Sequence, residues 1–303
     1  MTLIYFAAPA LWEDYAAILP ALLAQSGISA QIVTTAPDDP SLVDFIIYAP
    51  SAPLQDFTPF TGCRAVLSLW AGVERIVGNA TLTQPLCRMV DTGLTEGMVD
   101  WVAGHVLRHH LGMDRHIINP GHIWDQTCPP LARDRVVAML GMGALGTACS
   151  AALRGLNFQV LGWSRSGETM GRAGLRAVLE RADFIVTLLP KTPETENLLN
   201  AETLAWAKPG AVIINPGRGA LIDDEALIAA LDRGQIGAAT LDVFRAEPLP
   251  QTHAFWHHPQ ITVTPHIAAD TRADGAAKVL VENIRRGLAG QAFLHLVDRV
   301  RGY

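Results

Sequence analysis

The sequence predicts an α/β fold built from two doubly wound parallel sheets. One observation is length, because 303 residues exceed the size at which a single hydrophobic core usually divides. A second is the alternation of short apolar runs with helical stretches, which is typical of parallel strands covered by helices on both faces. A third is the glycine-rich turn Gly141-Met142-Gly143-Ala144-Leu145-Gly146, which directly follows one of the apolar runs.

Two series of strands are expected along the chain. The first series has helical periodicity from Trp12 to Gln25 and strands at residues 3–7, 31–34, 45–48, 65–69 and 88–90. A helix over residues 99–111 leads away from it. The second series has strands at residues 136–140, 158–163, 184–189, 211–215, 238–241 and 261–264, and a helix over 271–288 follows. Six strands are the number in a full dinucleotide-binding sheet.

The glycine turn predicts a site for a dinucleotide. Gly141 permits the tight turn, Gly143 lets a pyrophosphate approach the backbone, and Gly146 lets the helix pack close to the strand. Ala144 and Leu145 lie at the start of that helix, where unpaired N–H groups can bind phosphate oxygens. A glycine-rich turn without function is the alternative that the motif alone leaves open.

The end of the next strand indicates which dinucleotide binds. An NAD site usually places an acidic residue about 20 residues after the glycines, on the ribose 2′-hydroxyl. Here the strand ends in Ser164-Arg165-Ser166. A guanidinium pairs with a 2′-phosphate, which a carboxylate would repel. The sequence therefore favours NADP(H), with NAD(H) and a merely solvent-exposed Arg165 as the alternatives.

Three charged residues are the candidates for catalysis. Arg218, Glu247 and His266 each come just after one of the last three strands. Because ligands of open α/β sheets bind at the carboxyl ends of strands, all three can reach one crevice. Reduction of a ketone by hydride needs an acid for the new alkoxide, a cation near the carbonyl oxygen and a group that orients the acid. Each residue taken alone could instead be a cap, a loop residue or a surface acid.

Composition argues against several other classes. The net charge is −6 and no basic run occurs, so we expect no nucleic acid partner. No apolar run reaches the ~18 residues needed to cross a bilayer. The first six residues resemble a strand rather than a signal peptide, so we expect a cytoplasmic protein without a membrane partner.

No metal or disulfide is predicted. His105 and His109 have the i, i+4 spacing of metal ligands on a helix, but no third ligand accompanies them. The four cysteines are widely scattered and form no C-x-x-C motif, so reduced thiols are expected.

The chain resembles the D-isomer-specific 2-hydroxyacid dehydrogenases over nearly its full length, and within them the reductases of glyoxylate and hydroxypyruvate. The segments that carry the resemblance are Asp91–Gly93, Leu140–Gly146, Trp163–Arg165, Leu188–Thr195, Asn215–Asp223, Leu241–Phe244, Glu247–Pro250, Thr264–His266 and Val297–Tyr303. The resemblance implies a Rossmann cofactor domain, residues 99–267, inserted in a flavodoxin-like substrate domain, residues 1–98 plus 268–303. It also implies that the two domains close around the substrate.

The resemblance also implies roles for individual residues. His266 would be the general acid in reduction, oriented by Glu247, and Arg218 would bind the substrate carboxylate and polarise the keto oxygen. Pro190 and Asp242 would contact the cofactor, Asp242 through the nicotinamide carboxamide. Three further residues would contact the substrate, namely Trp70, Ala71 and Gly72, the last two through backbone amides.

Two tryptophans have both a functional and a structural interpretation. Trp70 stands where relatives often have glycine and would narrow the pocket towards small acids, or it is a core residue. Trp124 would reach into a partner subunit, so that a homodimer is implied, or it packs locally.

The resemblance implies NADPH-dependent reduction of small 2-keto acids, with glyoxylate and hydroxypyruvate first. The alternatives are an NAD-linked dehydrogenase of a larger acid, a non-catalytic dinucleotide sensor resembling the co-repressors of this fold, and a methyltransferase.

Overall fold

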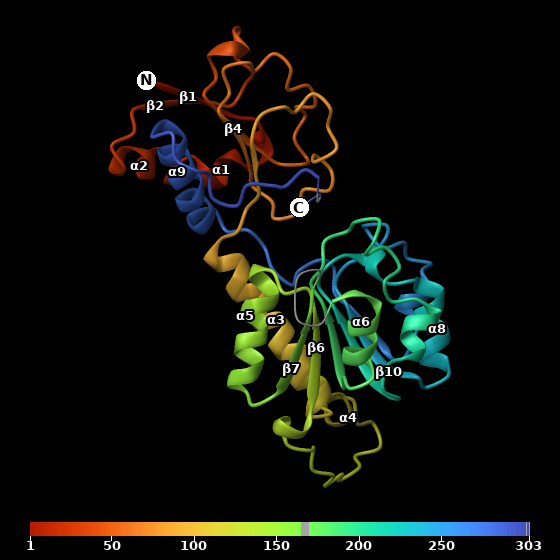
Figure 1. Cartoon of the computed structure of the whole chain (residues 1–303). Helices are drawn as coiled ribbons and strands as arrows, with labels where there is room; N and C mark the ends of the chain where they lie inside the picture. The colour runs from red at the N-terminus through yellow and green to blue at the C-terminus, as the bar shows by residue number, and fades with distance from the viewer. Residues whose placement is uncertain (165–169, 301, 303) are drawn as a thin grey trace. The chain divides into compact units, whose positions relative to one another are not determined.

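The chain divides into two compact α/β units (Figure 1). The computed structural model describes residues 1–164, 170–300 and 302. The first unit comprises Met1–Leu94 and Asp270–Tyr303, and the second comprises Thr95–Ala269. Each contains one sheet in which every strand pair is parallel, so the predicted fold class is confirmed.

The first unit holds a five-stranded sheet of order β2-β1-β3-β4-β5. Its strands are β1 (Thr2–Phe6), β2 (Ala30–Val33), β3 (Phe45–Tyr48), β4 (Ala65–Ser68) and β5 (Leu86–Cys87). Its helices are α1 (Trp12–Tyr15), α2 (Ile18–Gln25) and α9 (Ala273–Leu288). Strands β3 and β4 are buried at every residue, as expected for parallel strands covered on both faces.

Two predictions for this unit were wrong in detail. The strand expected at residues 88–90 lies at Leu86–Cys87, because the backbone of Arg88 and Met89 leaves the sheet to donate to His295 and Trp70. The helix expected from Trp12 to Gln25 is broken after Tyr15 and resumes two residues before Pro20. A proline beyond the first turn of a helix removes one of its backbone hydrogen bonds.

The second unit holds a six-stranded sheet of order β11-β10-β9-β8-β6-β7. Its strands are β6 (Val136–Leu140), β7 (Gln159–Trp163), β8 (Phe184–Thr187), β9 (Ala211–Asn215), β10 (Ile236–Leu241) and β11 (Ile261–Val263). Its helices are α3 (Thr92–His110, which begins in the last residues of the first unit), α4 (Asp114–Ile117), α5 (Ala144–Gly155), α6 (Gly171–Leu179), α7 (Ala201–Ala205) and α8 (Asp224–Asp232).

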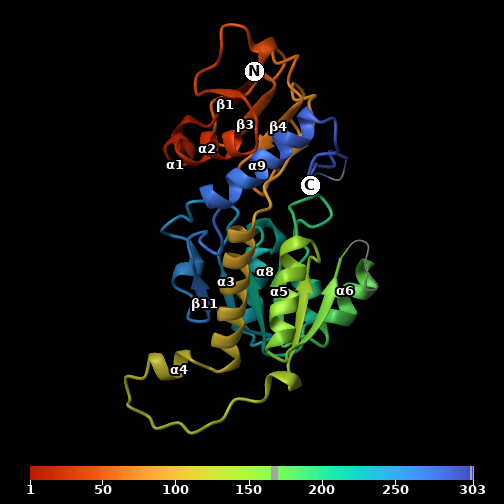
Figure 2. The ribbon, with the colours of Figure 1, turned by 90° about the vertical axis from the view of Figure 1, so that its left-hand side faces the viewer.

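Alternation along the central strands builds two cores in this unit. Val137 and Met139 of β6 pack with apolar residues of α3 and α5, which lie together in Figure 2. Ala138 and Leu140 of the same strand pack on the opposite face with residues of α6, α7 and α8. The sheet is therefore a middle layer between two layers of helices.

The strand order reverses between β6 and β8. The amide of Leu188, just beyond β8, donates to the carbonyl of Leu140 at the end of β6 (2.7 Å). A crevice at such a reversal is where open α/β sheets bind ligands. In the described part of the chain, no helix is long and apolar enough to cross a membrane.

Candidate active site

The glycine turn has the geometry of a dinucleotide cradle. Gly141 has φ +112°, and a Cβ there would collide with the carbonyl of Leu188. A Cβ on Gly146 would collide with the carbonyl oxygen of Gly141. A Cβ on Gly143 would meet no atom within 4 Å, and no side chain caps helix α5 behind it. The amides of Ala144 and the next residues therefore lie at a helix start where an anion can bind, so the turn fits a pyrophosphate.

The structure describes only some of the residues that are predicted to bind the rest of the cofactor. Ser164 directly follows β7, whereas Arg165 and Ser166 lie outside the described residues. Pro190 follows β8, and its carbonyl accepts the hydroxyl of Thr195 (2.7 Å), which fixes the turn. Binding of a cofactor by these residues stays a prediction.

His266 and Glu247 form a hydrogen-bonded pair. The distance from His266 Nδ1 to Glu247 Oε2 is 2.8 Å, and the imidazole is 54% exposed. The other carboxylate oxygen of Glu247 accepts the amide of Phe244 (2.8 Å). The bond at Nδ1 leaves Nε2 as the ring nitrogen that can exchange a proton with a substrate.

Asp242 accepts hydrogen bonds from the backbone of the segment that contains His266. This carboxylate is fully buried and accepts the amides of Ile267 and Ala268, both at 2.9 Å, and the hydroxyl of Thr264 (2.5 Å). Its own carbonyl accepts the amide of His266 (2.9 Å), whose φ is +57°. The described bonds of Asp242 therefore hold the backbone on both sides of His266, and its predicted contact with a nicotinamide stays a prediction.

Arg218 lies in the loop after β9, at the same sheet edge as the other two. Strands β9, β10 and β11 are neighbours and parallel, so their carboxyl ends share one edge. The turn that carries Arg218 is shaped by Asn215, which is almost fully buried. Its amide nitrogen donates to the carbonyl of Arg218 (3.0 Å), and its oxygen accepts the hydroxyl of Thr187 (2.6 Å) and the amide of Gly217 (3.1 Å).

Gly217 is required by close packing rather than by a special φ. A Cβ at this position would lie 2.7 Å from the carbonyl oxygen of Thr187. The loop of Arg218 is thus pressed against the end of β8, and glycine allows the approach.

Trp70, Ala71 and Gly72 belong to the first unit, after β4. The Ser68 hydroxyl donates to the carbonyl of Trp70 and accepts its amide, both at 3.1 Å, which fixes the turn. Trp70 is 37% exposed, so it is not a core residue. It lines a pocket of about 500 Å³ within the first unit, together with Leu11, Asp14, Tyr15, Ile18, Leu69 and residues 270–274. Contact of these residues with a substrate stays a prediction.

The histidines of α3 are packing residues. His109 bonds Thr240 of β10 through Nε2 (2.9 Å), and burial lowers its pKa to about 4. The ring of His105 contacts that of Trp101. No group of three or more potential metal ligands gathers in the described residues.

The cysteines form no disulfides. Cys63, Cys87 and Cys149 are buried, and burial raises the pKa of each thiol to about 12. Cys128 is exposed, and all four are free.

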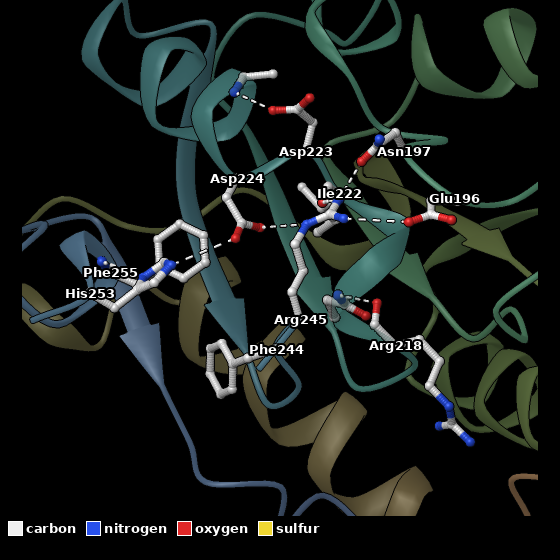
Figure 3. A network of polar contacts seen from close by, with 12 residues as sticks. Glu196, Asn197, Arg218, Ile222, Asp223, Asp224, Phe244, Arg245, His253 and Phe255 are labelled. Atoms are coloured by element: carbon white, nitrogen blue, oxygen red, sulfur yellow. Dashed lines mark hydrogen bonds and ion pairs between the residues drawn. The ribbon is translucent and has the colours of Figure 1, made fainter. Parts of the chain in front are cut away.

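Sequence reasoning missed the residues that hold the site together. The sequence predicts no role for Asn215, although it lies in a segment that carries the resemblance, and none for Arg245, two residues before Glu247. Figure 3 shows the guanidinium of Arg245 surrounded by polar groups, while the side chain of Arg218 extends away from them. The sequence shows only that Arg245 lies close to Glu247, and this spacing does not predict which residues of other loops the guanidinium contacts.

Comparisons with known proteins agree on one family. The sequence profile of the D-isomer specific 2-hydroxyacid dehydrogenase, NAD binding domain, matches residues 104–268. The chain is 36% identical to glyoxylate/hydroxypyruvate reductase A of Serratia proteamaculans over 79% of this chain and 82% of that protein. It is 37% identical to the protein of the same name from Yersinia enterocolitica over the same shares.

Solved structures give the same result over the whole chain. A D-isomer specific 2-hydroxyacid dehydrogenase from Xanthobacter autotrophicus Py2, in complex with NADPH and MES, matches with a TM-score of 0.90 and 35% identity, covering 100% of this chain and 99% of that one. An NADPH-dependent glyoxylate/hydroxypyruvate reductase from Sinorhizobium meliloti, in complex with NADP and sulfate, matches with a TM-score of 0.87 and 33% identity over 100% of both chains.

Proposed function

Because the chain belongs to the D-isomer-specific 2-hydroxyacid dehydrogenase family and is a homologue of NAD(P)-dependent enzymes, we propose that it reduces small 2-keto acids with NADPH. Glyoxylate and hydroxypyruvate are the first candidates, and the products are the 2-hydroxy acids. The observation that carries the proposal is the pair of His266 and Glu247, joined at 2.8 Å, at the strand-end edge of a sheet that also bears the glycine cradle.

His266 is the general acid of this proposal. Nδ1–H of the ring donates a hydrogen bond to Glu247, which leaves Nε2 for the substrate. When bound, the reduced nicotinamide supplies a hydride to the keto carbon. The Nε2 proton of the imidazolium goes to the keto oxygen, which becomes the hydroxyl group, and a neutral imidazole remains. In the oxidation direction the same nitrogen takes the proton back.

Arg218 is the cation of this proposal. Its guanidinium can bind the substrate carboxylate through two parallel hydrogen bonds and polarise the neighbouring keto oxygen. The bonds of Asn215 fix the backbone of this turn, and Nη1 of Arg218 donates to the carbonyl of Gly217 (2.7 Å) in the same turn. A fixed cation costs little reorganisation when negative charge develops on the oxygen.

The preference for NADPH rests on Arg165 and on the relatives. The strand end of this chain has no acid that would bind a ribose 2′-hydroxyl. Two structural relatives bind NADPH or NADP, and one of them is named an NADPH-dependent reductase. These observations favour NADP(H), and NAD(H) is the weaker alternative.

The test is a panel of 2-keto acids assayed with both nicotinamides. We expect the highest kcat/KM with NADPH and with glyoxylate or hydroxypyruvate. A higher kcat/KM with NADH and a larger keto acid would replace the proposal by the NAD-linked dehydrogenase. Binding of NADPH without turnover of any keto acid would favour the dinucleotide sensor, and both outcomes overturn the proposed activity.

We also infer that the protein forms a homodimer through the segment after α4. This segment has internal hydrogen bonds, two of them between Asn119 and Ile123 (2.9 Å each), so it is a formed loop. It extends away from the sheet of its own unit (Figure 2). Its apolar side chains are exposed, Trp124 to 87%, with Ile118, Ile123 and Leu131, and Ile117 at the end of α4 is exposed beside them. Such a concentration of exposed apolar area indicates a protein interface.

A further inference from the structure

Arg245 lies between two residues of the proposed active site. It belongs to the loop that runs from Asp242, at the end of β10, to Glu247. Its guanidinium donates through Nη2 to the carbonyl of Ile222 (2.5 Å) and to the side chain of Asn197. Figure 3 shows these contacts converging on the one guanidinium.

Two acids balance the charge of this guanidinium. Asp224 lies 3.5 Å from its Nε and Glu196 lies 3.7 Å from its Nη1. Burial raises the pKa of Asp224, and the charge of Arg245 acts in the opposite direction. The Arg245 side chain is only 34% exposed, so these contacts are partly shielded from water.

The partners of Arg245 come from two connections that are far apart in the sequence, one after β8 and one from β9 to the start of α8. Asn197 follows β8, in the segment that also contains Pro190. Ile222 ends the loop that begins after β9 and carries Arg218, and Asp224 is the first residue of α8. A guanidinium has five N–H donors in a rigid planar fork, whereas an ammonium group has three donors on a freely rotating head, so arginine is suited to hold several acceptors in fixed directions.

The position of Glu247 depends on this loop. Its Oε1 accepts the amide of Phe244, the residue directly before Arg245, and its Oε2 meets His266. A shift of the backbone at Arg245 therefore moves the amide that orients the carboxylate. Displacements of about 1 Å at such sites are known to cost large factors in rate.

We propose that Arg245 is a positioning residue that holds the loop of Glu247 against the loops of β8 and β9 and so keeps the carboxylate on His266. The proposal rests on the proposed function for its consequence in turnover. The contact between Glu247 and His266 can be measured without turnover, so a failure of this proposal can be distinguished from a failure of the proposed function.

The first measurement is the ring ¹⁵N chemical shifts of His266, assigned by their loss in His266→Ala. In the wild type we expect the neutral ring to carry its proton on Nδ1, which donates a hydrogen bond to Glu247. We expect Arg245→Met, which keeps the apolar stem and removes the donors, to shift the ring towards the Nε2–H tautomer. The control Arg233→Ala removes an exposed arginine of the same unit and leaves the shifts unchanged. Unchanged shifts in folded Arg245→Met overturn the proposal.

The second measurement is a double-mutant cycle in reduction. We expect Arg245→Met to lower kcat about tenfold when Glu247 is present and less than about twofold in the Glu247→Ala background, because residues that act as a unit are not additive. KM for the keto acid and Kd for NADPH change by less than about twofold, since neither ligand is bound by Arg245. An equal loss of kcat in both backgrounds overturns the proposal.

A second variant covers a failure of Arg245→Met to fold. Asn197→Gly removes one partner of the guanidinium and preserves the backbone, because Asn197 has φ +52° and glycine adopts this conformation freely. We expect the ¹⁵N shifts to change in the same direction as in Arg245→Met, but by less. We also expect a loss of kcat that disappears in the Glu247→Ala background. Wild-type shifts in Asn197→Gly together with an unfolded Arg245→Met show that Arg245 serves only stability, which also overturns the proposal.

Discussion

His266 is held by two carboxylates that act at different points. Glu247 accepts from the ring, whereas Asp242 accepts from the amides of the two residues that follow the histidine. The φ of +57° at His266 costs free energy in a non-glycine residue. The buried charge of Asp242 offsets that cost because charge-assisted hydrogen bonds are the stronger class.

Replacement of His266 tests the acid. We expect His266→Ala to lower kcat for reduction by about 10²–10⁴-fold, the usual contribution of a positioned general acid. Binding of NADPH should change little, because the imidazole meets the keto oxygen rather than the phosphates. Steady-state rates and fluorescence titration of NADPH measure the two effects. Turnover near that of the wild type would exclude His266 from this role.

Replacement of Arg165 tests the choice of cofactor. We expect Arg165→Ala to weaken binding of NADPH by about 1.5–3 kcal/mol, the contribution of a hydrogen bond to a charged group. Binding of NADH should stay the same because it has no 2′-phosphate. Dissociation constants for both cofactors, measured side by side, decide this. Equal losses for the two would contradict a phosphate contact.

The sequence indicates the residues whose side chains suit the reaction, but it does not indicate the residues that hold the loops in position. The resemblance implies the pairing of His266 with Glu247, and the position of each residue after a late strand is compatible with it. The sequence assigns no role to Asn215, although it lies in the segment Asn215–Asp223, or to Arg245, which lies between two of the segments that carry the resemblance. Their partners are backbone carbonyls and amides of other loops, and neither periodicity nor a motif encodes which loop lies opposite.

At the scale of elements, apolar runs located the strands and capping decided the ends of helices. Strand β3 was predicted at its observed bounds because four apolar residues lie between polar turns. Helix α3 begins at Thr92, seven residues before its predicted start. Asp91 accepts the amides of Gly93 and Leu94, which is a helix cap. The residues Asp91-Thr92-Gly93 are compatible with such a cap, but in the sequence they indicate only the resemblance to the family.

Helix α3 predicts how stability depends on pH. Burial lowers the pKa of His109 from 6.5 to about 4, and it lowers the pKa values of His105 and His110 in the same direction. Between pH 4 and 6.5 the unfolded chain therefore binds more protons than the folded one. Stability rises with pH through this range and is lost as the pH falls through it.

The measurement is urea unfolding at two pH values. From about pH 7.5 to about pH 5 we expect His109 to account for a loss of about 1–2 kcal/mol, discounted because the ring is partly exposed. His109→Gln should reduce the difference between the two pH values by that amount, whereas the exposed His257→Gln should not change it. An identical pH dependence in His109→Gln and the wild type would contradict this assignment.

At the scale of the whole molecule, the strands of both units follow the same order. Each sheet begins with a strand that lies between the second and the third, β1 between β2 and β3 and β6 between β7 and β8. The alternation of strands and helices predicts that the strands are parallel, because parallel strands need crossovers that return over one face or the other, but it does not predict their order. How two units or two chains meet depends on exposed surface, which the alternation of apolar residues does not describe.

The exposed segment after α4 predicts the oligomeric state. We expect the wild type to sediment at twice its mass of 32.6 kDa at micromolar concentration. The variant Ile118→Glu/Trp124→Glu should sediment as a monomer, because two charges would be buried without partners in the apolar contact. Leu42→Glu places a charge on another exposed apolar residue, in the first unit, and should stay dimeric. A wild type that sediments as a monomer, or a double variant that stays dimeric, would remove the segment from the interface.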